Sequence, residues 1–432
     1  MRPSARVQMA IDLLDGMFEG LRPADQVLAT IFRRSRFIGS KDRRAVRDLV
    51  YGVIRHRSRL VHRLRQYGAD ETPRALVLAY LVISGTESIS ELFDGSAHSP
   101  MPLDGREPDM VAELAHFHGD ADQPVPVRLE IPDWLYPLLQ QSFGDNLIAE
   151  MQGLNAEAPV DLRANSLKSD RETELAALRA ADIEAEATAY SPIGIRLSRR
   201  LTLGNYPSYK EGRVEVQDEG SQLAALLCGV KPKMKVIDFC AGAGGKTLAL
   251  AAAMKGRGDL IACDTDGRRL AELQVRADAA GITEMLGYRA LSGDDDPWLT
   301  EHAGKADVVL VDAPCSGVGA WRRSPDARWL LTEERLQGYL DLQKEILDRA
   351  ATLVKPGGKL VYVTCSLLRD ENEAQSAAFR DRQPGFASHD LGPELGELGL
   401  SALPSRQGEV TLSPATTGTD GFFISVMRRA DG

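Results

Sequence analysis

The 432-residue sequence predicts an α/β protein. Its last two hundred residues are expected to form a doubly wound, mostly parallel sheet, preceded by a small α+β segment and an all-α region. Three observations support this: apolar strands that alternate with helices, short β-prone pieces around one helix before them, and helical periodicity near the start. Three domains are expected. Residues 1–125 form a helical domain with a Pro-, Gly- and Asp-rich linker from about residue 92, residues 126–228 an α+β segment, and residues 229–432 the α/β domain.

The amino-terminal region has the periodicity of amphipathic helices. Apolar side chains recur at spacings of three and four over residues 4–20 and again over 41–68, where Ser40 is the expected helix cap. Residues 1–66 hold 15 Lys and Arg against 6 Asp and Glu, although the whole chain has a net charge of −10. A basic module joined to an acidic body indicates a phosphate-facing surface, with a solvated helix face as the alternative.

Composition excludes several classes of protein. No run of about 18 apolar residues could span a membrane, and MRPSARVQMA lacks the apolar stretch of a signal peptide, so a cytoplasmic location is expected. The five cysteines form no CxxC pair and have no His nearby, which argues against a disulfide framework and a metal site. Cys228 and Cys263 are expected to be small buried hydrophobes.

The α+β and α/β parts follow in order along the chain. Strands are predicted at 160–165, 193–198, 234–240, 259–264, 306–314 and 358–366, and helices at 171–181, 246–256 and 335–354. In doubly wound sheets, ligands bind beyond the carboxyl ends of the strands. Cys315 and Cys365 each follow a strand at that edge.

The turn VIDFCAGAGGKT indicates a nucleoside ligand. Gly242, Gly244 and Gly245 permit a tight turn that brings backbone N–H groups close to a ligand at the start of a helix. Asp264, after the second strand, can accept hydrogen bonds from both hydroxyls of a ribose. The rival interpretation is a P-loop, but Cys240 stands where the P-loop needs its first glycine.

Several motifs together resemble one family. DFCAGAGGKT, ACDTDGRRL, VDAPCSG with RRSPDARW, KPGGKLVYVTCSLLRDENE and GTDGFF are similar to the RsmB/Sun family of S-adenosylmethionine-dependent RNA cytosine-5 methyltransferases. GSKDRRAVRDLVYGVIR resembles the family's NusB-like RNA-binding domain, and LRANSL with RVEVQDEGSQ resembles its linking segment. The likeness spans nearly the whole chain. It implies a Rossmann-like class I methyltransferase domain, S-adenosylmethionine as cofactor, 16S ribosomal RNA as substrate, and a monomer.

The sequence departs from the family at two places. Ala243 stands where the family commonly has Pro, which should loosen the turn without removing a backbone donor. After the third strand, the acidic residue expected near the adenine has no clean match, and both Asp294 and Ser292 are candidates.

The chemistry of methyl transfer to C5 of cytosine explains why two thiols are needed. A thiolate that adds to C6 makes C5 nucleophilic, and after methyl transfer a base must remove the C5 proton. The resemblance assigns Cys365 as nucleophile, Cys315 to product release and Asp312 to the flipped base. Lys246 could lower a thiol's pKa by its charge, a solvated helix residue being the alternative. The implied cofactor-binding residues are Cys240, Ala241, Gly242, Ala243, Gly244, Gly245, Lys246, Asp264, Arg269 and Asp312.

Arg322, Arg323 and Arg328, just after Cys315, are expected to hold phosphates around the target base, with plain surface charge as the alternative. Two other functions stay open. One is an RNA-binding ribosome-assembly factor without catalysis, and the other is the same chemistry on transfer RNA. The intact Cys315, Cys365, Asp312 and Asp264 favour the enzyme.

Overall fold

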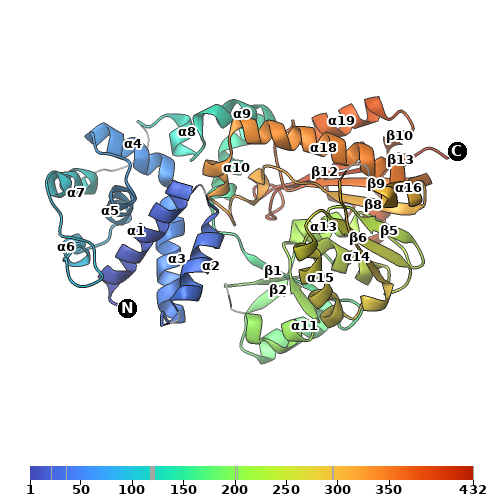
Figure 1. Ribbon diagram of the computed structural model, residues 1–432, viewed down its shortest axis with the longest axis horizontal. Coiled ribbons are helices and arrows are strands. Elements are labelled where there is room, and N and C mark those ends of the chain that lie inside the picture. Colours follow the sequence, from blue (N-terminus) through green and yellow to red (C-terminus); the bar gives the residue numbers. More distant parts are fainter. Residues whose placement is uncertain are drawn as a thin grey trace. The chain divides into compact units, whose positions relative to one another are not determined.

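The computed structural model describes residues 1–20, 22–35, 37–116, 122–199, 201, 203–293 and 296–431 (Figure 1). Contacts group the chain into two compact units, Met1–Asn155 with Trp321–Glu333, and Ala156–Ala320 with Glu334–Gly432. The three domain ranges expected from the sequence stay a prediction.

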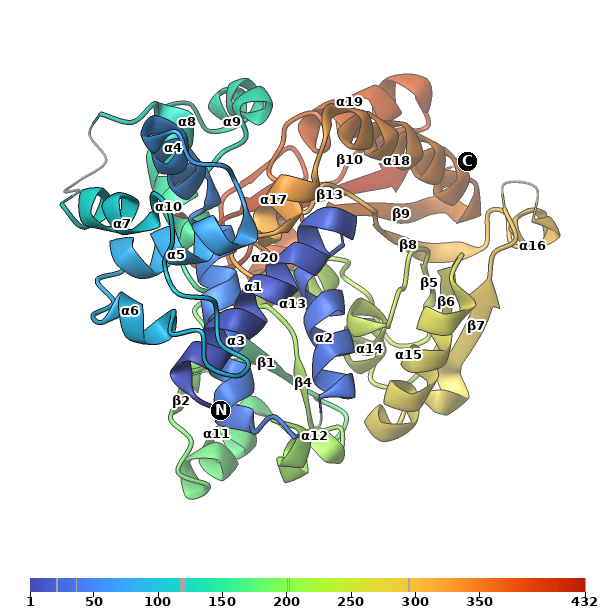
Figure 2. The ribbon, with the colours of Figure 1, turned by 60° about the vertical axis from the view of Figure 1, so that its left-hand side comes forward.

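The first unit is helical. Its α-helices are α1 (Pro3–Gly20), α2 (Ala24–Arg34), α3 (Ser40–Arg55), α4 (Arg57–Tyr67), α5 (Pro73–Ile83), α6 (Ile89–Leu92), α7 (Glu107–Ala115), α8 (Val125–Arg128), α9 (Tyr136–Phe143), α10 (Leu147–Asn155) and α17 (Ala327–Leu330). Helices α1, α3 and α5 pack against one another (Figure 2). Leu13, Val50 and Leu78 are fully buried in their shared core, as the apolar periodicity requires.

Two details of the predicted helix over 41–68 are wrong. Ser40 is the first helical residue rather than the cap, and Gly39 before it offers no side-chain cap. The helix also breaks at His56 into α3 and α4. The carboxylate of Glu130 accepts hydrogen bonds from the Ser58 N–H at 2.7 Å and from Arg59 at 2.8 Å. A distant carboxylate thus caps the first turn of α4, which no local pattern could reveal.

Part of the stretch from about residue 92, expected as a linker, is helical. It contains α7, whose Met110 and Leu114 are buried in the helical core. Residues 117–121 of this stretch lie outside the described residues.

The second unit begins with a small antiparallel sheet. Its strands are β1 (Val160–Ala164), β2 (Ala185–Ala187), β3 (Gly194–Leu197) and β4 (Val214–Val216), in the order β2-β3-β1-β4. Helix α11 (Arg171–Ala180) packs on them, and α12 (Pro207–Lys210) precedes β4. The predicted strands at 160–165 and 193–198 and the helix at 171–181 are confirmed.

A larger mixed sheet forms the rest of this unit. Its strands are β5 (Lys235–Asp238), β6 (Asp259–Asp264), β7 (Leu286–Ala290), β8 (Ala306–Asp312), β9 (Val354–Thr364), β10 (Phe386–Ser388), β11 (Ser405–Arg406), β12 (Glu409–Leu412) and β13 (Phe422–Arg429). The order is β11-β12-β13-β9-β8-β5-β6-β7, with β10 on β13. The strands from β9 to β7 run parallel, and β13 is antiparallel to β9.

Helices cover both faces of the large sheet. They are α13 (Glu219–Leu226), α14 (Gly245–Ala253), α15 (Gly267–Ala280), α16 (Pro297–Glu301), α18 (Glu333–Leu353), α19 (Glu373–Arg382) and α20 (Gly392–Glu397). Helices α13, α14 and α15 lie on one face, and α18 and α19 on the other (Figure 1). Val308 and Leu310 pack toward the first set while Val309 and Val311 pack toward the second, because side chains alternate along a strand. The predicted doubly wound fold is confirmed.

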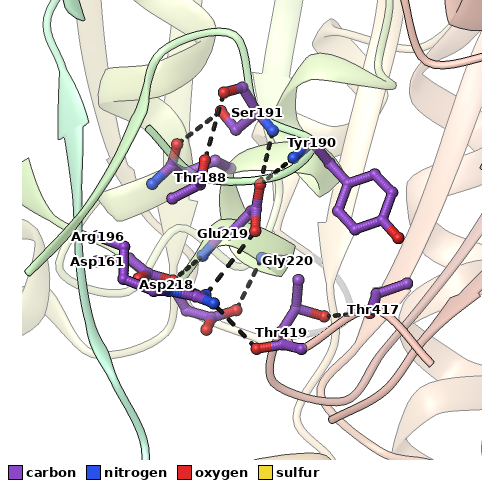
Figure 3. A network of polar contacts seen from close by, with 12 residues as sticks. Asp161, Thr188, Tyr190, Ser191, Arg196, Asp218, Glu219, Gly220, Thr417 and Thr419 are labelled. Atoms are coloured by element: carbon purple, nitrogen blue, oxygen red, sulfur yellow. Dashed lines mark hydrogen bonds and ion pairs between the residues drawn. The ribbon is translucent and has the colours of Figure 1, made fainter. Parts of the chain in front are cut away.

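A buried polar network joins the small sheet to the large one (Figure 3). Arg196 on β3 donates two hydrogen bonds to Asp161 on β1, at 2.8 and 2.9 Å. Asp161 in turn accepts the N–H of Glu219 at the start of α13, and the Glu219 carboxylate accepts the Ser191 N–H at 2.7 Å. These contacts hold the two sheets of this unit together.

No helix among the described residues is long and apolar enough to cross a membrane. Within the same residues, no three His, Cys, Asp or Glu side chains are grouped as a metal ion would need.

Candidate active site

The candidate site lies where the direction of the strand order reverses. From β5 the chain proceeds through β6 and β7 on one side, and through β8 and β9 on the other. The loops leaving β5 and β8 therefore diverge at their carboxyl ends, which is where doubly wound sheets bind ligands. The glycine turn follows β5, Asp312 is the last residue of β8, and Cys315 lies in the loop after it.

The glycine turn depends on backbone conformations that other residues rarely adopt. Gly244 has φ of +83°, and a Cβ there would lie 2.0 Å from the Leu273 side chain. Gly242 has φ of +56°, and a Cβ there would lie 2.5 Å from the Arg269 guanidinium. The turn thus leads directly into Gly245, the first residue of α14. This shape is consistent with the prediction that the backbone of the turn comes close to a ligand at the start of a helix.

The other turn residues are also present in this loop. Cys240 and Ala241 are half-buried, and the Ala241 N–H bonds to the Cys263 carbonyl at 2.8 Å. Burial raises the pKa of Cys240 well above its ordinary value. Ala243 stands where the family commonly has proline. Its carbonyl accepts a hydrogen bond from Arg276 on α15, which holds the backbone in place at this position.

Asp264 is held against the glycine turn. Its carboxylate accepts the Gly242 N–H and the Asp266 N–H, each at 2.8 Å. Arg269 lies 3.8 Å from the same carboxylate and is mostly exposed. Asp264 therefore occupies the end of β6 with its oxygens fixed by backbone donors.

Asp238 is a candidate residue that sequence reasoning missed. It is fully buried at the end of β5, one oxygen accepts the Thr247 hydroxyl at 2.7 Å, and Oδ1 has no hydrogen-bond partner among the described residues. Burial raises its pKa to about 7. The available signal was an acidic residue inside the apolar run MKVIDFC.

Lys246 and Asp312 form an ion pair beside the turn. The Lys246 ammonium donates to the Asp312 carboxylate at 2.8 Å and lies 5.2 Å from the centre of the Phe422 ring. Burial lowers the pKa of Lys246, but the charge and hydrogen bond of Asp312, together with other nearby acidic groups, outweigh burial and leave the pKa raised. Because Lys246 is buried, the alternative of a solvated helix residue is wrong.

The two cysteines after β8 and β9 meet. The Cys315 and Cys365 sulfur atoms are 3.4 Å apart. The hydrogen bond to Cys365 raises the pKa of Cys315 well above its ordinary value, and burial and the charge on Cys365 act in the same direction. The Cys315 thiol therefore keeps its proton at neutral pH, with the Cys365 sulfur within hydrogen-bonding distance.

Backbone contacts link the two cysteine loops. The Gly319 N–H donates to the Cys365 carbonyl at 2.9 Å, and the Gly319 carbonyl accepts the Gly421 N–H at 2.8 Å. A Cβ on Gly319 would lie 2.2 Å from the Gly421 carbonyl oxygen, so this crossing of chains needs glycine. The GTDGFF segment thereby supports the site.

Three other predicted residues, Arg322, Arg323 and Arg328, belong to the helical unit. The phosphate-holding role expected for Arg322 and Arg328 is wrong because both are buried in the helical unit. Arg328 donates to the Glu130 carbonyl at 3.0 Å and lies over the Trp321 ring. Arg323 is half-buried, and its role stays a prediction.

The residue near the adenine is not decided. Ser292 is exposed and bonds to the Asp296 carboxylate, which also caps α16. Asp294 lies outside the described residues. Cys228 and Cys263 are fully buried, as predicted.

Comparisons with known proteins identify two matching families and several relatives of this chain. The family described as 16S rRNA methyltransferase RsmB/F matches residues 225–428, and the ferredoxin-like domain of RsmF/B-like methyltransferases matches residues 131–203. The ribosomal RNA small subunit methyltransferase B of Pseudomonas putida is 31% identical over 407 residues, which cover 90% of this chain and 91% of that relative. The protein of the same name from Sodalis glossinidius is 30% identical over 413 residues, 90% of each chain.

Solved structures share the fold. The crystal structure of PH0851 matches with a TM-score of 0.78 at 23% identity over 99% of both chains. The crystal structure of NSun6 from Pyrococcus horikoshii with SFG matches with a TM-score of 0.60 at 18% identity, over 70% of this chain and 99% of that one.

Proposed function

Because this chain belongs to the RsmB/F family of 16S rRNA methyltransferases, we propose that it transfers a methyl group from S-adenosylmethionine to C5 of a cytosine in 16S ribosomal RNA. We assign the covalent step to Cys365. The single observation that carries this proposal is the pair of thiols 3.4 Å apart, at the same sheet edge as the Lys246–Asp312 ion pair.

In the first step, the Cys365 thiolate adds to C6 of a flipped cytosine. The C5–C6 double bond opens and its electron pair becomes available at C5. Asp312 contacts the base, and the Lys246 proton beside it is the hydrogen-bond donor available as charge develops on N3. C5 would then bond to the methyl group of S-adenosylmethionine while the bond between that methyl and the sulfonium sulfur breaks, its electron pair staying on sulfur.

Release follows from the coupling of the two thiols. Bonding of Cys365 to C6 disrupts its hydrogen bond with the Cys315 thiol, which is the largest of the influences that raise the pKa of Cys315. Cys315 can then lose its proton to solvent and remove the proton from C5. The C–H electron pair restores the double bond, and Cys365 leaves as a thiolate.

The cofactor fits the turn after β5. Bound S-adenosylmethionine supplies the methyl group from its sulfonium centre. The turn from Cys240 to Lys246 provides backbone donors, with no side chain at Gly242 and Gly244 to obstruct them. Asp264 would accept from the ribose hydroxyls, with Arg269 beside it. Asp238 Oδ1, which has no hydrogen-bond partner among the described residues, would accept from the amino group of the cofactor's methionine part.

RNA contact is assigned to the helical unit. Arg33 and Arg34 at the end of α2 and Lys41 and Arg44 at the start of α3 are exposed, and Phe37 between them is 83% exposed. Cations beside an exposed aromatic ring are typical of surfaces that bind single-stranded nucleic acid. Arg55 and Arg59 from the same basic region are used instead in contacts within the unit.

The test separates the two cysteines. Cys315→Ala should transfer the methyl group and then stall with RNA bound through Cys365, so a denaturing gel with substrate RNA and S-adenosylmethionine should show a slowly migrating adduct. Cys365→Ala should give neither adduct nor methylation. An adduct with Cys365→Ala alone would reverse the assignment, and no adduct with either folded variant would favour the non-catalytic assembly factor. Transfer RNA in place of 16S RNA decides between the two substrates.

A further inference from the structure

Glu371 is a fully buried carboxylate between the two cysteine loops. It lies in the RDENE segment that follows β9, and the mechanism above gives it no role. Burying a carboxylate is costly unless hydrogen bonds replace its water. Its partners therefore indicate what the residue is for.

Those partners are the residues that directly follow the two cysteines. Ser316, next to Cys315, donates its N–H to Glu371 at 2.8 Å and its hydroxyl to the other carboxylate oxygen. Ser366, next to Cys365, donates its hydroxyl to that same oxygen. The two hydroxyls are 3.1 Å apart. One carboxylate thus holds both loops at the position adjacent to each thiol.

The carboxylate is itself anchored to the fold. Gln343 on α18 donates to Glu371 at 3.0 Å and to the Pro314 carbonyl, before Cys315, at 2.9 Å. The Tyr362 hydroxyl on β9 donates to the Glu371 carbonyl at 2.7 Å. These contacts fix Glu371 relative to both the sheet and the helix that covers it.

The neighbouring Asn372 strengthens the same arrangement. Its amide donates to the Ser366 carbonyl at 3.0 Å and accepts from the Thr364 hydroxyl at 2.6 Å. The loop that carries Cys365 is therefore held on both sides of the cysteine.

We propose that Glu371 is a positioning residue that sets the distance between the Cys315 and Cys365 thiols. This inference rests on the proposed function, in which Cys365 must reach C6 and Cys315 the adjacent C5. Loss of the carboxylate removes its bonds to both loops and leaves the Gly319–Cys365 backbone bond and the contact between the two serine hydroxyls to link them, so the distance between the thiols is less tightly set. A displacement of about 1 Å in a reacting group costs on the order of 100-fold in rate.

A first measurement needs neither RNA nor cofactor. Oxidised dithiothreitol converts two neighbouring thiols into a disulfide and is itself reduced to the dithiol. The rate of disulfide formation in the free protein therefore reports how often the two sulfur atoms meet. Peptide mapping identifies the Cys315–Cys365 crosslink. Glu371→Ala should slow its formation by about tenfold or more, because the effective concentration of one thiol at the other falls. Glu174→Ala, which removes a buried carboxylate on α11, is the matched control and should leave the rate unchanged.

A second measurement addresses catalysis. In Glu371→Ala, kcat for methylation should fall by about 100-fold while KM for S-adenosylmethionine stays within about twofold, since the cofactor turn is untouched. If this variant does not fold, the double variant Ser316→Ala with Ser366→Ala removes both hydroxyl bonds to the carboxylate and keeps only the Ser316 N–H bond to it.

The outcomes distinguish the two levels of the proposal. An unchanged crosslinking rate in a folded variant overturns the positioning role. Slower crosslinking with unchanged kcat upholds the positioning role and overturns the two-thiol mechanism of the proposed function. Slower crosslinking with a lower kcat upholds both.

Discussion

The glycine turn after β5 and the cysteine loops after β8 and β9 lie at one sheet edge but are held in different ways. The turn is shaped by its own backbone, through positive φ at Gly242 and Gly244. The cysteine loops are shaped by side chains from elsewhere, chiefly Glu371 and Gln343. A turn of the first kind is sensitive to a single methyl group, whereas loops of the second kind are sensitive to loss of a hydrogen bond.

This difference predicts separable defects. Changes in the turn should weaken cofactor binding without altering the encounter of the two thiols, and the Glu371 variants should do the reverse. A turn variant that slows Cys315–Cys365 crosslinking would break the comparison.

The largest effect is expected for Gly244→Ala. An alanine there combines a left-handed φ with a Cβ 2.0 Å from Leu273, so the turn must shift. Such strain costs about 3 kcal/mol, which corresponds to about 100-fold weaker cofactor binding by calorimetry. Gly338→Ala on α18 is the control, because it lies outside the turn and its Cβ would meet nothing within 4 Å. Equal effects of the two substitutions would contradict the assigned role of the backbone.

A smaller loss is expected for Asp264→Ala. The carboxylate is held by the Gly242 and Asp266 N–H groups, and it would bind the ribose hydroxyls. Removing hydrogen bonds to a charged group should weaken S-adenosylmethionine binding by about 1.5 to 3 kcal/mol. Unchanged affinity in the folded variant, measured by calorimetry, would remove Asp264 from the site.

The smallest effect is expected for Asp238→Asn, and it depends on pH. The pKa of Asp238 is raised by burial to about 7, above its value in the unfolded chain, so its contribution to stability falls as pH rises from about 4 to 7. The asparagine variant lacks this loss. We compare the free energy of unfolding of the variant with that of the parent, both without cofactor. The difference in favour of the variant should be about 2 kcal/mol larger at pH 8 than at pH 5.

Urea unfolding at the two pH values measures this difference. Thr247→Val, which removes the hydroxyl that donates to Asp238, should instead lower stability most at high pH. A gain in Asp238→Asn that does not change with pH would show that the carboxyl titrates normally.

Much of this molecule follows from local patterns in the sequence. Continuous apolar runs predicted β5, β6, β8 and β9, because parallel strands covered on both faces admit few polar residues. The motifs also indicated the family and brought Cys315, Cys365 and Asp312 into one proposed site. The glycines of the turn were recognisable because the conformation they permit is a property of the residue itself.

What failed depended on partners far along the chain. The break between α3 and α4 is stabilised by Glu130, and Arg328, which looked like a phosphate contact, is buried over Trp321. Neither arrangement leaves a periodic signal.

The sequence by itself determined the order of helices and strands, the turn after β5 and the two cysteines at strand ends, since these depend on side-chain size, polarity and backbone freedom at each position. Only the tertiary structure decided which buried polar groups meet. It brought Asp238 and Lys246 to the sheet edge and placed Glu371 between two serines fifty residues apart. The physical reason is that a buried charge needs partners wherever the fold can supply them, and packing rather than sequence distance selects those partners.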